Sequence, residues 1–171
     1  MQNTPQSFIS KMPVDFLMLA FAMLTLFSCW FCTADVNLYG IILDMGILIF
    51  SIALFVCLCI VEFFNYQKAQ NAILLGLIFS IVTIVYNQLA YYLPSPEFAE
   101  KMGQMYNPFV EAQAKSAIDF FQAYLISTFF GMFILAKSKA WFYGEKIFIR
   151  MAVVFFLSIG MFSILFKWFY H

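Results

Sequence analysis

The residues that could do chemistry in this chain are a few polar side chains set within long apolar runs. A charged side chain at the centre of a membrane-spanning helix costs roughly 3 kcal/mol on insertion scales, so a retained one indicates pairing or contact with a solute. The candidates for solute binding are these six residues: Glu62, Asn87, Gln88, Asp119, Gln122 and Arg150. Glu62 stands out because Phe63 and Phe64 still follow it before a polar turn begins.

Each candidate also has a structural interpretation. Glu62 and Arg150 are expected at the same membrane face, where an ion pair would either hold helices together or form part of a gate. Asp119, like Asp44, is more readily interpreted as an interfacial residue that contacts helix-start amides or water. For the amides of Asn87, Gln88 and Gln122, hydrogen bonds between helices, at about 0.6 kcal/mol each, are favoured over contact with a polar ligand.

Catalytic and metal-binding patterns are not found in the sequence. It contains no nucleophile–His–Asp arrangement, no phosphate-binding glycine loop and no H-E-x-x-H motif. Its single histidine is His171, and its cysteines, at positions 29, 32, 57 and 59, lie in apolar stretches without a second Cys/His pair that would complete a zinc site. We therefore expect buried thiols, no metal or cofactor, and no enzymatic activity.

The elements that position these residues are membrane spans. The chain has 171 residues, of which 64% are hydrophobic and 11% charged, with 9 basic and 9 acidic side chains. A soluble domain usually has about a quarter of its residues charged. Lipid must therefore surround most of the apolar side chains, and the absence of a basic stripe argues against a nucleic-acid partner.

The apolar runs predict an all-α bundle of about five transmembrane helices in one membrane domain, residues 1–171. A helix of about 20 residues crosses the hydrocarbon layer. The spans are expected at about 16–33, which is slightly short, 41–64, 72–92, 117–136 and 147–169. Between the third and fourth spans, residues 97–115 predict an amphipathic segment lying at the interface and broken at Asn107–Pro108.

Basic residues predict the orientation. Lys137, Lys139, Lys146 and Arg150 surround the loop between the last two spans, whereas the loop between the first two has no lysine or arginine. Basic loops face the cytoplasm, so we expect the N-terminus inside and the segment 97–115 outside. The first 13 residues lack the pattern of a removable signal peptide.

Several short motifs resemble those of the VUT family of small membrane proteins, which are queuosine precursor transporters. The similar stretches are Leu38–Gly40, Met45–Phe50, Val61–Ile73, Leu93–Pro94, Tyr106–Val110, Ala123–Ser127 and Ile147–Arg150. The resemblance implies a helical carrier of deazaguanine precursors, with Glu62 and Arg150 retained from the polar residues that bind the solute.

The chain also departs from the family pattern. Phe50–Ser51 replaces a Phe-Pro pair, Leu58 replaces an aspartate and Asn65 replaces a glycine. Polar residues of the family's fourth and fifth helices fall near Thr128, Gly131 and the range 158–163, and a sixth helix is not found. These differences leave open a more apolar substrate or a relative that no longer transports.

We therefore expect a transporter-like protein of the bacterial inner membrane that takes up a small organic solute, with a queuosine precursor as the first candidate. The pocket would lie among the second to fifth spans. The alternative is a non-transporting accessory subunit that docks against a membrane-protein partner.

Overall fold

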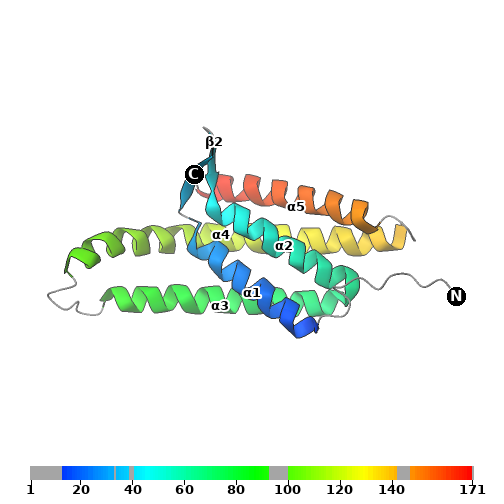
Figure 1. The fold of residues 1–171 in the computed structure, drawn as a ribbon, viewed down its shortest axis with the longest axis horizontal. Helices are drawn as coiled ribbons and strands as arrows, with labels where there is room; N and C mark the ends of the chain where they lie inside the picture. The colour runs from blue at the N-terminus through cyan, green and yellow to red at the C-terminus, as the bar shows by residue number, and fades with distance from the viewer. Residues whose placement is uncertain (1–12, 33, 39–40, 93–99, 142–146, 171) are drawn as a thin grey trace.

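The computed structural model describes residues 13–32, 34–38, 41–92, 100–141 and 147–170. Within these ranges the chain forms helices and one β-hairpin (Figure 1). In chain order the elements are α1 (Val14–Trp30), β1 (Asp35–Leu38), β2 (Ile41–Asp44), α2 (Met45–Phe63), α3 (Tyr66–Tyr92), α4 (Glu100–Trp141) and α5 (Ile147–Tyr170).

The expected all-α membrane bundle is confirmed. Four helices are long and apolar enough to cross a membrane, within Met45–Phe63, Tyr66–Leu89, Val110–Lys139 and Ile147–Phe169. Helix α1 is apolar but has 17 residues, which corresponds to about 25 Å and falls just short of the hydrocarbon thickness of about 30 Å. Its shortness agrees with the prediction for the first span.

The predicted start of the second span, residue 41, is wrong. Residues Ile41–Asp44 form β2, which pairs antiparallel with β1, so that Asp35 lies opposite Asp44. The run Ile-Ile-Leu is as compatible with a strand as with a helix, because a short apolar run has no diagnostic period. Helix α2 begins after Asp44, whose Oδ1 accepts hydrogen bonds from the amides of Gly46 at 2.6 Å and Ile47 at 3.3 Å. The predicted contact of Asp44 with helix-start amides is thereby confirmed, and its place at the membrane interface stays a prediction.

The boundaries around the third and fourth spans also need correction. Helix α3 begins at Tyr66, so much of the predicted polar turn is helical. Helix α4 runs without a break from Glu100 to Trp141 and contains Pro108, although a break was predicted there. A proline removes one intrahelical hydrogen bond, which a long helix of a membrane protein tolerates when its neighbours support it. Residues 100–115 of the predicted amphipathic segment therefore form the first part of α4, and residues 97–99 lie outside the described residues.

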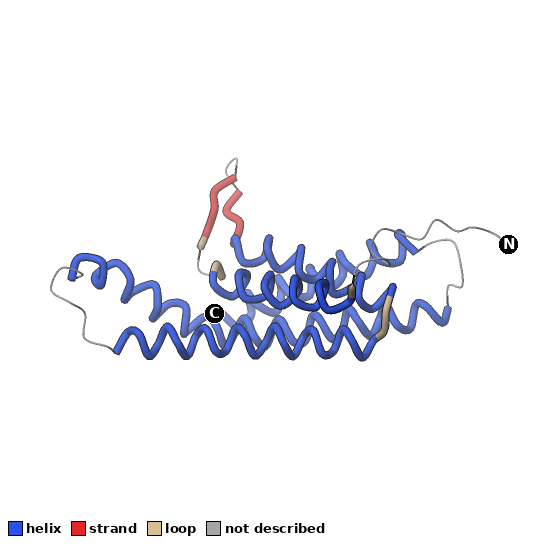
Figure 2. The backbone as a smooth tube through the Cα atoms, turned by 60° about the horizontal axis from the view of Figure 1, so that its bottom comes forward, coloured by secondary structure: helices blue, strands red, loops and turns tan. Residues whose placement is uncertain are grey.

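Helix α4 is the longest element, with 42 residues, which corresponds to about 63 Å. It packs between α3 and α5, while α1 packs on α2 and α3. Figures 1 and 2 show that the end of α3 and the start of α4 extend beyond the other helices, and that the β-hairpin projects from the bundle. Helix α2 contacts α1, α3, α4 and α5 and is therefore central.

The interior between α2, α4 and α5 is filled by rings, which we call the aromatic cluster: Phe50, Phe120, Tyr124, Phe162 and Phe166. The ring centroids of Phe50 and Phe162 are 4.1 Å apart, and those of Phe120 and Phe162 are 5.7 Å apart in an edge-on arrangement. All four cysteines are buried and free, so the expected burial of the thiols is confirmed.

Candidate functional site: a buried ion cluster at the ends of three helices

Three helix ends meet at the site. Glu62 is the penultimate residue of α2, Lys139 lies in the last turn of α4 and Arg150 lies in the first turn of α5. Because α5 returns antiparallel to α4, its start lies beside the end of α4, and the end of α2 reaches the same level. The topology thus brings together residues that are far apart in the sequence.

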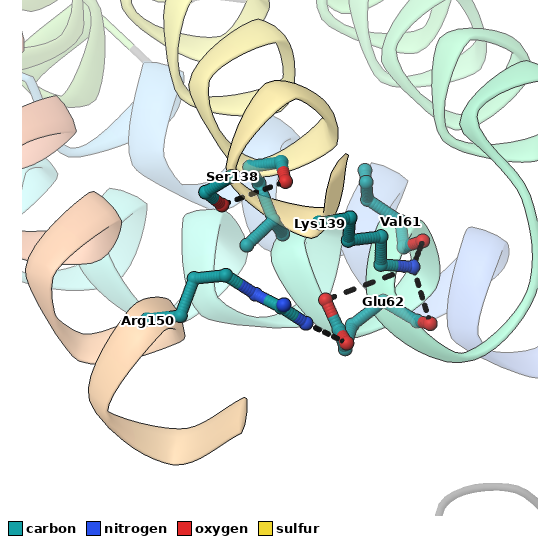
Figure 3. Close-up of polar contacts among 6 residues, drawn as sticks. Val61, Glu62, Ser138, Lys139 and Arg150 are labelled. Carbon is teal, nitrogen blue, oxygen red and sulfur yellow. Dashed lines mark hydrogen bonds and ion pairs between the residues drawn. The ribbon is translucent and has the colours of Figure 1, made fainter. Parts of the chain in front are cut away.

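The carboxylate of Glu62 is the centre of this group, which we call the ion cluster (Figure 3). Its side chain is only 5% exposed, and its Oε1 accepts a hydrogen bond from Nη2 of Arg150, whose side chain is 10% exposed. The ammonium of Lys139 lies 3.6 Å from Oε2 of Glu62. The single anion is therefore shared by two cations from two other helices.

Lys139 has a second function in the cluster. Its Nζ donates hydrogen bonds to the carbonyl oxygens of Val61 at 2.9 Å and Glu62 at 2.7 Å (Figure 3). The last carbonyls of a helix have no intrahelical donor and carry the negative end of its dipole. Lys139 therefore stabilises the end of α2 from α4. Oε2 of Glu62 is buried and makes no hydrogen bond to any described residue, so it retains capacity to accept one.

The predicted pairing of Glu62 with Arg150 is present in the structure. Lys139 was missed, because it was assigned to a loop after a span ending at residue 136. The signal that would have found it is periodicity: Thr128, Met132 and Leu135 are buried on one face of α4, and Lys139 continues that spacing.

Asn87 and Gln88 lie in a different place, between α3 and α4. The amide nitrogen of Asn87 donates to Oε1 of Gln113 at 3.0 Å, and that of Gln88 donates to the carbonyl oxygen of Val110 at 3.2 Å. Gln113 is buried and was also missed, because the segment around it was expected to lie at the interface. These contacts agree with the predicted hydrogen bonds between helices.

The structure does not bring Asp119 and Gln122 to the ion cluster. Both lie on α4, and Lys139 follows Asp119 by 20 residues, which is about 30 Å along the helix axis. Asp119 is half-buried and Gln122 is exposed. Both were expected in the first turns of a span beginning at about residue 117. That expectation is wrong, because α4 begins at Glu100 and both residues lie in its interior.

The ion cluster can bind and orient polar groups, and it joins helices. A carboxylate between two cations offers both acceptors and donors in apolar surroundings, where such contacts are strong. Within the part of the chain that the structure describes, no group of three or more His, Cys, Asp or Glu side chains is placed to hold a metal ion.

Comparison with known proteins gives one match. No curated protein and no solved structure is significantly similar to the chain. A family model described as "Putative vitamin uptake transporter" matches residues 44–170, which include the end of the β-hairpin and all of α2 to α5. The match contains Glu62, Lys139 and Arg150, and it covers most of the chain. This membrane protein therefore belongs to the vitamin uptake transporter family.

Proposed function

We propose that the chain carries a small organic solute across the bacterial inner membrane, and that the ion cluster forms its cytoplasmic gate. The observation that carries this proposal is the burial of Glu62, which is 5% exposed between Lys139 and Arg150 at the ends of three apolar helices. Ionisable residues at such positions mark solute or ion pathways in membrane proteins. Membership in an uptake family supports the same conclusion.

The ion cluster suits a gate because its contacts are concentrated at one end of the bundle. Separating α5 from α2 there requires the Arg150–Glu62 pair to part, and separating α4 requires Lys139 to leave Glu62 and Val61. Alternating access proceeds by such movements of helix groups around a central site. Binding of a polar solute would offset the loss of these ion pairs and hydrogen bonds, because the polar groups of the solute can replace the separated partners.

A queuosine precursor, a deazaguanine base, is the first candidate solute. The resemblance of Val61–Ile73 to the corresponding motif of deazaguanine carriers supports it. So does Oε2 of Glu62, which is buried without a hydrogen bond from any described residue. A deazaguanine carries several N–H donors, and a carboxylate is their natural acceptor.

Uptake in a bacterial strain unable to import queuosine precursors tests the proposal. Expression of the unaltered chain should restore accumulation of a labelled deazaguanine base, and Glu62→Ala should reduce it to the background of the empty vector. Glu111→Ala is the matched control, since Glu111 is an exposed carboxylate on α4 away from the cluster, and its uptake should equal that of the unaltered chain. No uptake by the unaltered chain, with the protein present in the membrane fraction, would reject this solute class.

The orientation can be tested separately. The basic residues near the ion cluster predict that this end of the bundle faces the cytoplasm. Reporter fusions after Tyr66, Met102 and Tyr143 should indicate cytoplasm, exterior and cytoplasm. The reverse pattern would place the ion cluster at the outer face and would contradict its assignment as the cytoplasmic gate.

An accessory subunit is the second candidate function. Its support is the exposed apolar surface of α5, where Phe148 is 81%, Phe156 72% and Ile164 71% exposed, although lipid covers such a face equally well. Purification in a mild detergent distinguishes the two functions. A carrier should elute alone or as a homo-oligomer and restore uptake, whereas a subunit should elute with a stoichiometric membrane-protein partner.

A further inference from the structure

The Ser158 hydroxyl differs from nearly all the other buried hydroxyls of this chain. Among the residues that the structure describes, seven serine and threonine side chains are buried: Thr25, Ser28, Ser80, Ser116, Ser127, Thr128 and Ser158. Five of them donate a hydrogen bond to a backbone carbonyl oxygen. Ser80 and Ser158 make no hydrogen bond to any described residue.

An unbonded hydroxyl in an apolar interior is unfavourable, because it has lost its water without gaining a partner. Helical serines usually avoid this by donating to a carbonyl of the preceding turn, and Thr128 does so on the neighbouring helix at 2.6 Å. Ser158 is 0% exposed and does not. Its hydroxyl therefore has donor and acceptor capacity that no described residue uses.

Ser158 lies where three helices meet. It faces Gly131 of α4 so closely that a Cβ atom on Gly131 would collide with Oγ of Ser158, and the same Cβ would lie 3.8 Å from Cδ2 of Leu58 on α2. The absence of a side chain at Gly131 thus lets the Ser158 hydroxyl pack directly against the α4 backbone in this closed structure. The meeting point is formed by the same helices that supply the ion cluster.

The meeting point also lies between the two clusters. On α5, Ser158 is one turn before Phe162 and two turns after Arg150. On α2, Leu58 is two turns after Phe50 and one turn before Glu62. On α4, Gly131 is two turns after Tyr124 and two turns before Lys139. Each level is about 6–12 Å from the next along the helix axes. The order aromatic cluster, hydroxyl, ion cluster is the same on all three helices.

We propose that Ser158 is a contact point for the transported solute, on a route between α2, α4 and α5 that is closed in this structure by the aromatic cluster at one end and the ion cluster at the other. This inference rests on the proposed transport function and names where the solute is held. A site near the middle of the bilayer, with a closure on either side, is the arrangement that alternating access requires.

The surroundings define the chemical class of the solute. Rings from α2, α4 and α5 on one side favour a flat molecule that stacks, and the hydroxyl can donate to or accept from a ring heteroatom. A small planar heterocycle fits both features. An aliphatic solute would leave the hydroxyl unbonded, and a multiply charged one would have to part from water among the aromatic residues.

Thiol labelling of cysteine variants in intact membranes tests the route. The background is a chain in which the four cysteines, at positions 29, 32, 57 and 59, are replaced by alanine. In this background Ser158→Cys is compared with Ser80→Cys. Ser80 is the matched control, because both hydroxyls are buried without a hydrogen bond to any described residue and only Ser158 lies between α4 and α5. A small water-soluble methanethiosulfonate reagent should label position 158 at least ten times faster than position 80. Full labelling of both variants after denaturation, and elution as single species in detergent, show that they are folded and reactive. Equal rates, or faster labelling at position 80, would overturn the route.

Solute contact is tested with a labelled deazaguanine base as the probe. In a chain that takes up this base, its presence at saturating concentration should slow labelling of Ser158→Cys at least threefold, and Ser158→Ala should raise KM for uptake at least fivefold while Ser80→Ala leaves it unchanged. Unchanged labelling and KM would overturn the contact at Ser158. Failure of the unaltered chain to take up the base would contradict the proposed function, whereas the labelling ratio would still decide whether the route passes Ser158.

Discussion

The Lys139 ammonium and Glu62 are joined in two ways: Nζ donates to the Glu62 carbonyl oxygen at 2.7 Å and lies 3.6 Å from the same residue's Oε2. One cation thus neutralises a side chain and caps the helix that carries it. This relationship ties the end of α4 to the end of α2 independently of Arg150. The ion cluster therefore has two separable parts, a helix cap and an ion pair.

Lys139→Gln should destabilise the protein through loss of the cap. A cation near a helix C-terminus contributes up to about 2 kcal/mol where it is partly buried, and we expect a loss of about 1–2 kcal/mol in the free energy of unfolding in detergent. Lys137→Gln is the matched control, because Lys137 is exposed and its Nζ lies 5.7 Å from the ring centroid of Phe133. Equal losses of unfolding free energy for the two variants would show that the hydrogen bonds from Lys139 to α2 contribute nothing to stability.

Glu62→Ala should destabilise more than Arg150→Ala. Removing the carboxylate leaves two cations without their shared anion, whereas removing Arg150 leaves Glu62 with Lys139. Breaking a buried pair costs about 3–5 kcal/mol, so Glu62→Ala should lie in that range. The double variant Glu62→Leu/Arg150→Leu should lose less free energy of unfolding than the two single leucine variants lose together. Both charges of the pair are removed in the double variant, so neither is left buried without the other. Additive losses in a denaturation double-mutant cycle would mean that the two residues do not interact.

The number and type of the long helices follow from the sequence because lipid demands about 20 apolar residues per span. Their ends do not follow, because local composition there is ambiguous. Ile41–Asp44 reads as the start of a helix until its pairing with β1 is known. Pro108 indicates a break until the length of α4 is known. Both errors arise where tertiary contacts decide between two locally allowed conformations.

In the candidate site, too, some residues could be predicted from the sequence and others only from tertiary contacts. Opposite charges and a shared membrane face were enough to pair Glu62 with Arg150. Lys139 required knowledge that α4 continues to Trp141, and Gln113 required knowledge that its segment packs on α3. The resemblance pointed to the range 158–163 only in general, because what distinguishes Ser158 is a hydrogen bond that it does not make, and only the structure shows this.

Asn87→Leu should have a small effect, because interhelical hydrogen bonds in membranes are weak. The Asn87–Gln113 bond joins α3 to α4 at 3.0 Å between two buried amides, but polar side chains also find partners in the unfolded state within the membrane, which reduces the net gain. We expect a coupling free energy of about 0.6 kcal/mol between Asn87→Leu and Gln113→Leu in a double-mutant cycle, and uptake unchanged within a factor of two. Complete loss of uptake with unchanged stability would instead assign Asn87 to solute binding.

Phe162→Ala should be among the most destabilising substitutions in α5. Its ring is 1% exposed and contacts the rings of Phe50, Phe120 and Phe166. Removing such a ring leaves a cavity and costs about 3–5 kcal/mol. Phe156→Ala is the control on the same helix, because that ring is 72% exposed and loses few protein contacts. Comparable unfolding free energies for the two variants would show that the aromatic cluster is not packed as described.

Gly46→Ala should disrupt the junction of α1 and α2. A Cβ at Gly46 would lie 2.8 Å from the Cα of Cys32 and 2.8 Å from the carbonyl oxygen of Ser28, and backbone atoms cannot turn aside as a side-chain end can. The same backbone contact is held by Ser28, whose Oγ donates to the carbonyl oxygen of Gly46 at 2.7 Å. Overpacking of this kind costs about 1–3 kcal/mol.

Gly160→Ala is the matched control, because a Cβ there meets nothing within 4 Å. Alanine favours a helix over glycine by about 1 kcal/mol, so this variant should be as stable as the unaltered chain or slightly more stable. Thermal unfolding of both variants in one detergent gives the comparison, and the Gly46→Ala midpoint should be the lower. A Gly46→Ala protein as stable as Gly160→Ala would mean that α1 does not approach the start of α2 this closely, and that the short first helix is held in the bundle by other contacts.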